Sequence, residues 1–243
     1  MEQQKVIGPL HRTRKEKEMR YILLTAILVT AGTLLAANNA HADNAVFIEQ
    51  VGNTNTITIT QVGSANEVGS QPTHSSVNGN NNTVTSIQTG NTNILNYAVV
   101  GNGNTIANVA TGDNNTVTLN CGNNVTACTN VTSTTTITGD QNTVTQTIRG
   151  STITNTLTIA GNSNTVTQNI QTSNSTADIT ITGDSNVFTN TMSGASGGAG
   201  HHLLAVVLGT SNTHTVTQSG TVNTNVSINT NGNSNAVTVS TGN

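Results

Sequence analysis

A glycine followed three residues later by an asparagine recurs about every eleven residues along most of this chain. Short runs of Thr, Val, Ile, Asn and Gln separate the motifs, as in residues 56–62, TITITQV. Gly tolerates positive φ and Asn tolerates the left-handed region, so each motif predicts a tight bend. A motif that recurs at a fixed short period indicates a fold built from stacked structural repeats. The glycines expected to open the bends are Gly52, Gly63, Gly79, Gly90, Gly101, Gly112, Gly139, Gly161 and Gly183.

The unit that follows one bend, residues 142–148, alternates in character. Successive strand residues point to opposite faces, so one face receives Asn142, Val144 and Gln146, and the other receives only threonine. The apolar residues mark the first face as the inside. Each eleven-residue unit is therefore predicted to be one short strand and one bend.

Two units make a coil of 22 residues, in which equivalent positions stack about 4.8 Å apart. The chain is thus predicted to be all-β, as a β-solenoid of about nine coils with two short strands per coil. Identical amides in register can bond along the stack, which lets a narrow core be half polar without unpaired groups. The residues predicted to form these inner ladders are Asn55, Asn66, Asn82, Asn93, Asn104, Asn115, Asn142, Asn164, Asn186, Gln61, Gln88, Gln146, Gln168 and Gln218.

An up-and-down sheet of hairpins is the alternative fold. Asn78-Gly79, Asn102-Gly103 and Asn231-Gly232 are dipeptides typical of hairpin turns. Neighbouring strands would then be antiparallel, so like residues would not stack in register.

The regular spacing is broken by insertions. One lies near residues 69–75, and a second, rich in Gly and Ser, lies near residues 193–203. Both are expected to leave the solenoid from a corner, where such folds accept extra residues.

The N-terminal segment has the composition of a secretory signal peptide. Arg20 precedes a short apolar run, and an Ala-His-Ala signature follows at residues 40–42. We expect cleavage between Ala42 and Asp43. An uncleaved N-terminal anchor is the alternative.

The domain boundaries follow from that cleavage site. Residues 1–18 are expected to be an upstream extension or a mis-assigned start, and residues 19–42 the signal peptide. Residues 43–243 are then the mature repeat domain, which is expected to be secreted to the cell surface or beyond, without a membrane span.

The mature domain carries little charge, with seven acidic residues and one basic residue, Arg149. It offers neither a basic surface for nucleic acid nor a basic amphipathic helix for a membrane. We therefore expect no nucleic-acid partner.

Residues 48–68 closely resemble the repeat of curlins, the subunits of bacterial curli amyloid fibres, and the rest of the mature domain resembles it loosely. The resemblance rests on Gln, one residue, Gly, two residues and Asn at residues 50–55, 61–66 and 88–93. It implies a secreted, self-assembling β-solenoid for adhesion and biofilm, with itself as partner and with a nucleator or secretion chaperone. The family's second Gln is matched by Gln146, Gln168 and Gln218. The chain departs from the pattern in units such as those of Asn108 and Asn190, where Asn stands in place of Gln.

Few residues suggest other chemistry. Cys121 and Cys128 are predicted to form a disulfide in an exported protein, with two free thiols as the alternative. The adjacent His201 and His202 are expected to be exposed loop residues, because neighbouring side chains of an extended strand point apart. His214 is isolated in the sequence, and no metal or cofactor is expected.

The acidic residues suggest no hydrolase. Asp113, Asp140 and Asp184 each follow a repeat glycine and replace Asn in the bend. Catalytic carboxylates would have to meet in a cleft, and no nucleophile motif is present. We expect a protein that is not an enzyme.

Outward threonines suggest a second function. Thr-x-Thr pairs begin at Thr83, Thr116, Thr143, Thr165 and Thr215 and resemble the ice-binding face of β-solenoid antifreeze proteins. A monomeric ice-binding or glycan-binding solenoid is therefore the alternative function. Rows on one side only would favour it, whereas rows on both sides indicate an ordinary soluble strand surface.

The two ends of the mature domain look uncapped. A regular unit stands at each end, near residues 46–52 and 232–239, without Lys or Pro. Open strand edges of this kind pair with other chains, so head-to-tail fibres are expected.

Overall fold

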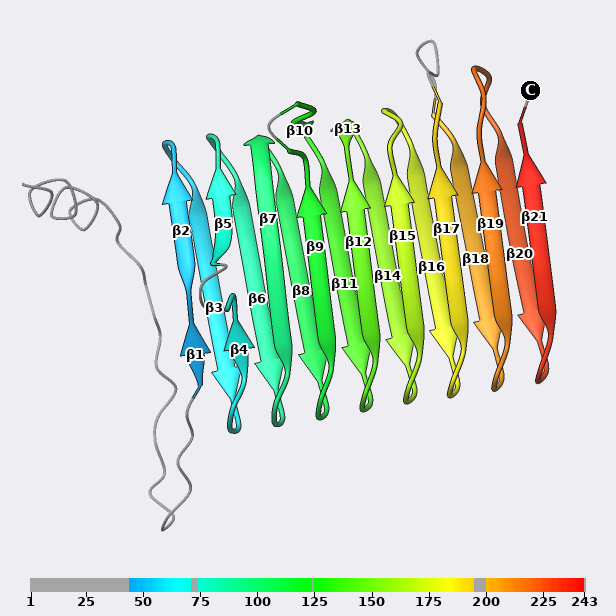
Figure 1. Cartoon of the computed structure of the whole chain (residues 1–243), viewed down its shortest axis with the longest axis horizontal. Coiled ribbons are helices and arrows are strands. Elements are labelled where there is room, and N and C mark those ends of the chain that lie inside the picture. The colour runs from blue at the N-terminus through cyan, green and yellow to red at the C-terminus, as the bar shows by residue number, and fades with distance from the viewer. Residues whose placement is uncertain (1–43, 71–73, 124, 195–199, 243) are drawn as a thin grey trace, which may run out of the picture.

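The computed structural model describes residues 44–70, 74–123, 125–194 and 200–242, and these contain strands and no helix. The strands form two sheets, each built from parallel strands. The chain contributes a strand to one sheet and then to the other as it winds along one axis (Figure 1). Accordingly, no helix that is long and apolar enough to cross a membrane lies within the described ranges.

The first sheet, called sheet A, has nine layers. Its first two layers are each split into two short strands. β10 pairs with the end of β7, and β13 pairs with β10. Sheet A contains β1 (Ala45–Val46), β2 (Ile48–Val51), β4 (Glu67–Val68), β5 (Ser75–Asn78), β7 (Ile94–Asn102), β9 (Thr116–Cys121), β10 (Cys128–Thr129), β12 (Thr143–Ile148), β13 (Gly150–Ser151), β15 (Thr165–Ile170), β17 (Val187–Met192), β19 (Thr213–Gln218) and β21 (Ala236–Thr241).

The second sheet, called sheet B, has eight layers and lies behind sheet A in Figure 1. Its strands are all of the same length. Sheet B contains β3 (Thr56–Val62), β6 (Thr83–Thr89), β8 (Thr105–Thr111), β11 (Thr132–Thr138), β14 (Thr154–Ala160), β16 (Thr176–Thr182), β18 (His202–Leu208) and β20 (Asn225–Asn231).

Pairing is parallel and in register in both sheets. Val144 pairs with Val166, and Val166 pairs with Phe188 one layer further on. The predicted all-β solenoid is thus confirmed, with about eight turns where nine were expected, and the hairpin meander is wrong. Neighbouring coils are 22 residues apart where the repeat is regular, as between Asn142 and Asn164.

The core lies between the two sheets and follows the predicted alternation. In β12, Val144, Gln146 and Ile148 are buried, and the threonines between them face outward. The same pattern continues through the central strands, so a narrow core of Val, Ile and polar side chains runs along the axis.

The first insertion does not leave from a corner as expected. The nine-residue β7 pairs with β4 near its start and with β5 near its end. β4 ends at Val68 and β5 begins at Ser75, so the insertion interrupts this layer of sheet A in its middle. There Phe47 stacks on His74, with ring centroids 6.2 Å apart, so a side chain of the insertion covers an aromatic ring of the first coil.

The other two insertions lie at corners of the solenoid, as expected for the second one. β17 ends at Met192 in sheet A and β18 begins at His202 in sheet B, so the second predicted insertion lies at the crossing. A further one, between Cys121 and Cys128, lengthens the coil from Asn115 to Asn142 to 27 residues.

Candidate functional site

One corner of the solenoid carries an unbroken column of asparagines, called here the long ladder. Asn164 is representative: its backbone N–H and its Nδ2 both donate to Oδ1 of Asn142, each over 3.0 Å. Its Nδ2 also donates to the carbonyl of Gly183 over 2.8 Å. The members of the long ladder are Asn44, Asn66, Asn93, Asn115, Asn142, Asn164, Asn186, Asn212 and Asn235.

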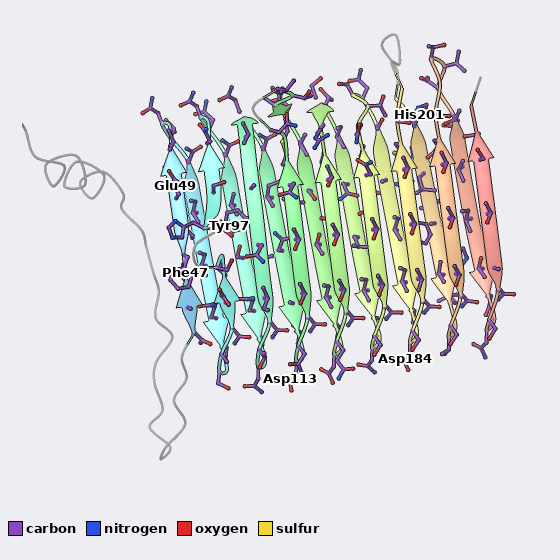
Figure 2. All side chains as sticks on the ribbon, viewed as in Figure 1. Phe47, Glu49, Tyr97, Asp113, Asp184 and His201 are labelled. Atoms are coloured by element: carbon purple, nitrogen blue, oxygen red, sulfur yellow. A yellow bond between two sulfur atoms is a disulfide. The ribbon has the colours of Figure 1, made fainter. Side chains whose placement is uncertain are left out.

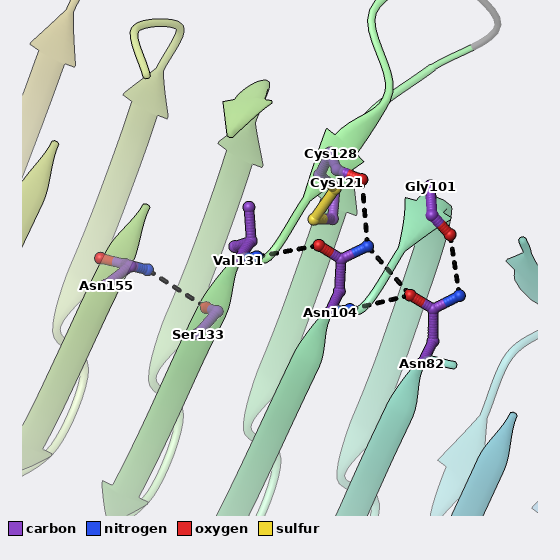
Figure 3. The surroundings of a disulfide bond; sticks show 8 residues. All are labelled: Asn82, Gly101, Asn104, Cys121, Cys128, Val131, Ser133 and Asn155. Atoms are coloured by element: carbon purple, nitrogen blue, oxygen red, sulfur yellow. Dashed lines mark hydrogen bonds between the residues drawn. A yellow bond between two sulfur atoms is a disulfide. The ribbon is translucent and has the colours of Figure 1, made fainter. Parts of the chain in front are cut away.

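The opposite corner carries a short ladder of Asn55, Asn82 and Asn104. It stops at Val131, whose N–H donates to Oδ1 of Asn104 over 3.0 Å (Figure 3). The next coils place Ile153, Ser175, His201 and Thr224 at the same position. The predicted ladder asparagines therefore fall into two columns, and the short one changes into a mixed column.

The turn glycines make this stacking possible. Gly79 has φ 142°, and a Cβ on it would collide with the carbonyl oxygen of Gly101 in the next coil. A side chain here would have to push the coils apart, so the glycines are required by close approach as well as by backbone conformation.

The predicted glutamines are bonded within the core. Gln61 donates to Gln88 over 2.9 Å, and Gln146 donates to Gln168 over 2.8 Å. Gln168 also donates to Asn155 of sheet B over 3.0 Å, which ties the two sheets together.

Gln218 lies in another column. It pairs in register with Met192, whereas Gln168 pairs with Asn190. Its Nε2 donates to the carbonyls of His202 and Thr224, each over 2.9 Å. It therefore closes a corner near the end of the described solenoid instead of extending a glutamine ladder.

The expectation that ladder bonding satisfies every inward amide is wrong at Asn108 and Asn190, and Oε1 of Gln218 also lacks a partner among the described residues. Asn108 and Asn190 are buried, and among the described residues their side-chain amides have no hydrogen-bond partner. The Tyr97 hydroxyl is likewise unpartnered there, and burial raises the pKa of Tyr97. These groups weaken the core locally, because a buried unpaired polar group costs about 1–3 kcal/mol.

Cys121 and Cys128 form a disulfide, with their Cα atoms 5.7 Å apart and both residues fully buried. The bond closes the base of a corner loop in which Val125 is 92 % exposed. Nδ2 of Asn104 donates to the Cys128 carbonyl over 3.1 Å, so the disulfide is in contact with the short ladder (Figure 3).

The expectation that His201 is an exposed loop residue is wrong, although His202 is exposed. His201 is fully buried at the upper corner in Figure 2. Its Nε2 lies 3.0 Å from the Ser193 carbonyl, which only accepts, so Nε2 carries the hydrogen. Its Nδ1 then accepts from the Thr224 hydroxyl over 2.9 Å. His201 thus replaces Asn at a corner.

The three aspartates of the bends, Asp113, Asp140 and Asp184, form part of a column of turn residues, and Figure 2 shows Asp113 and Asp184 at its lower corner. Oδ1 of Asp140 accepts the N–H of Asp113 over 2.8 Å, and Oδ1 of Asp184 accepts the N–H of Asn162 over 2.7 Å. They act as turn residues. No group of three or more His, Cys, Asp or Glu side chains in the described part of the chain could hold a metal ion.

Threonine columns cover both outer faces. Thr83 and Thr85 lie on sheet B, whereas the other predicted Thr-x-Thr pairs lie on sheet A. The longest column on sheet B is Thr56, Thr83, Thr105, Thr132, Thr154 and Thr176. The longest on sheet A is Thr118, Thr145, Thr167, Thr189, Thr215 and Thr238. Neither face is distinguished from the other as a binding surface.

The ends of the solenoid differ most from the rest of the molecule. Within the described residues, β20 and β21 each pair on one side only, as do β1, β2 and β3 at the other end. The apolar core residues that remain partly exposed all lie on these strands, namely Ile48, Ile57, Ile59, Val237 and Val239. The ends are thus open strand edges with apolar side chains.

The predicted cleavage residues Ala42 and Asp43 lie outside the described residues. No family model, no curated protein and no solved structure matches this chain.

Proposed function

We propose that the mature protein is a self-assembling structural subunit of an extracellular fibre, with no enzymatic role. The observation that carries this proposal is the pair of open ends. Each end presents unpaired strand edges beside partly exposed apolar core residues, such as Ile59 of β3 and Val239 of β21. Edges of this kind pair with open edges of other copies, and here one end of a copy would pair with the opposite end of the next.

The composition of the end strands supports end-to-end pairing. β1, β3, β20 and β21 contain no charged residue, and β2 contains only Glu49. Lys and Pro, which commonly block pairing of edge strands, are absent from all five strands. Little repulsion therefore opposes contact between copies.

The cellular role follows from the curlin resemblance. A secreted fibre of this kind would serve adhesion to surfaces and the biofilm matrix, and a nucleator or secretion chaperone would control where it grows. The segment most similar to curlins, residues 48–68, includes β2 and β3 of one open end.

Incubation of purified residues 43–243 tests the proposal. We expect unbranched filaments by electron microscopy and loss of monomer from the supernatant on sedimentation. Protein that stays monomeric for days at high concentration would contradict it, and would leave the isolated ice-binding or glycan-binding solenoid as the function to pursue.

A further inference from the structure

The two halves of the first complete coil are built alike. Asn55 stands at one corner and Asn66 at the other, eleven residues later. Nδ2 of Asn55 donates to the Gly79 carbonyl over 2.8 Å, and Nδ2 of Asn66 donates to the Gly90 carbonyl over 2.7 Å. The structural repeat is therefore half a coil, and a strand position in one sheet is equivalent to one in the other.

The number of half coils is odd. Sheet A has nine layers and sheet B has eight, so the described solenoid starts on β1 and β2 and finishes on β21, all in sheet A. If a second copy stacked with sheet A on sheet A, β1 and β2 of that copy would pair with β21. Its β3 and the first copy's β20 would then face each other across a gap one strand wide, and both edges would stay unpaired.

We infer that successive copies are related by a half turn about the solenoid axis, so that sheet A of one copy continues as sheet B of the next. This rests on the end-to-end assembly proposed above. After the half turn, β3 of the next copy pairs with β21, and its β1 and β2 pair with β20. Every edge strand at the junction then has a partner.

The side chains at this junction match. Strand positions that directly follow a corner align in the solenoid, so Thr56 of the next copy lies beside Ala236. In the same register the inward Ile59 lies on Val239. The Thr241 hydroxyl, which is buried without a partner in the described structure, faces Gln61 of the next copy.

The corner ladders also join. Asn235 ends the long ladder, and among the described residues its Oδ1 accepts no hydrogen bond, unlike Oδ1 of Asn212, which accepts two. The half turn places Asn55, the first member of the short ladder, on Asn235. Its N–H and Nδ2 then meet that free oxygen, as they do at each step of the short ladder from Asn55 to Asn104 and of the long ladder from Asn66 to Asn235.

Engineered disulfides test the half turn. Thr58 of β3 and Thr238 of β21 face outward at opposite ends of one copy, and the half turn brings them side by side between copies. Cα atoms of paired strands lie about 4.8 Å apart, within the range that a disulfide spans. We would assemble the variant Thr58→Cys/Thr238→Cys and oxidise it. Denaturing gels without reductant should show loss of the monomer band to covalent multimers, which reductant reverses.

The matched control is Phe47→Cys/Thr238→Cys, because Phe47 of the next copy would lie on Thr238 if sheet A stacked on sheet A. We expect its filaments to dissociate to monomers on the same gels. Filaments that cross-link only in this control, or in neither variant, would overturn the half turn and leave the proposed fibre standing. A protein that forms no filaments would overturn both.

Discussion

The imidazole of His214 stacks on the ring of Phe188 in the core, with centroids 5.7 Å apart and planes 17° apart. His214 is fully buried, and its Nε2 lies 2.8 Å from the hydroxyl of Thr230. Its Nδ1 has no partner among the described residues. Burial lowers the pKa of His214, because the charged form is desolvated.

This pKa shift makes stability depend on pH. The pKa of His214 is lower in the folded than in the unfolded chain, so the unfolded state binds more protons at mildly acidic pH. The stabilisation is complete above the unfolded pKa of about 6.5 and declines as pH falls below it. We expect the melting temperature to fall as the pH is lowered below about 6.5. The variant His214→Phe should lose most of this dependence, whereas replacing the exposed His202 by Asn should leave it intact. Equal pH slopes in all three proteins would refute this role of His214.

The long ladder is tested by Asn164→Asp. The carboxylate would face Oδ1 of Asn142 and the carbonyl of Gly183, two groups that only accept, in a fully buried site. We expect a loss of several kcal/mol at neutral pH that shrinks as acid protonates the carboxyl. Thr165→Ser, on the adjacent outward position, should cost less than about 1 kcal/mol. Chemical denaturation measures both, and similar losses would mean that inside and outside are misassigned.

Substitutions at two glycines, Gly161 and Gly232, distinguish an effect on folding from an effect on filament assembly. Gly161 and Gly232 both have positive φ, but a Cβ on Gly161 would collide with the Gly183 carbonyl, whereas the nearest atom to one on Gly232 is 3.3 Å away. Gly161→Ala should therefore lower the melting temperature more than Gly232→Ala. In the filament, Gly52 of the next copy would lie against Gly232, where a Cβ leaves no room for it. Gly232→Ala should therefore still prevent filament formation, and the protein should stay in the supernatant on sedimentation. Normal filaments from this variant would argue against the junction.

The disulfide between Cys121 and Cys128 should contribute modestly. It closes a short loop, for which the chain-entropy model gives about 2–3 kcal/mol. The double variant Cys121→Ala/Cys128→Ala should unfold at lower denaturant concentration but keep the solenoid's circular dichroism. Thiol titration of the unfolded, unreduced protein checks the bond itself, and two free thiols would rule it out.

An inward charge at the open end should stop growth. Val239 lies on the inner face of β21 and is partly covered, so Val239→Lys buries an ammonium in the junction. We expect filament growth to slow markedly. Thr167→Lys adds the same charge to an outward position in mid-solenoid and is expected to leave growth nearly unchanged. Equal growth of both lysine variants would argue against pairing through β21.

The periodic part of the fold was predictable from the sequence, because the alternation of residue types along each strand shows which side chains point inward and which point outward. Asn142, Val144 and Gln146 point inward for the same reason that the threonines between them point outward. The two columns of asparagines were predictable because two units make one coil, but which column continues past an insertion was not, because the insertions decide which corner each Asn reaches. Thus Asn115 lies next to Asn142 although 27 residues separate them.

The places where prediction failed depend on contacts that no local pattern contains. His201 is buried because a carbonyl from Ser193 and a hydroxyl from Thr224 meet it at a corner. The insertion after Val68 leaves from mid-strand because β7 is long enough to pair on both sides of it. Asn190 resembles a ladder residue in sequence, but it stands between Gln168 and Val216, and its side-chain amide has no hydrogen-bond partner in the described part of the chain.

Fibre diffraction from aligned filaments of residues 43–243 tests the central claim most directly. If copies pair end to end through β20 and β21, the strands lie across the filament and their hydrogen bonds run along it. We predict a reflection at about 4.8 Å along the filament axis. Filaments in which this reflection lies perpendicular to the axis, or protein that gives no filaments at all, would contradict the account.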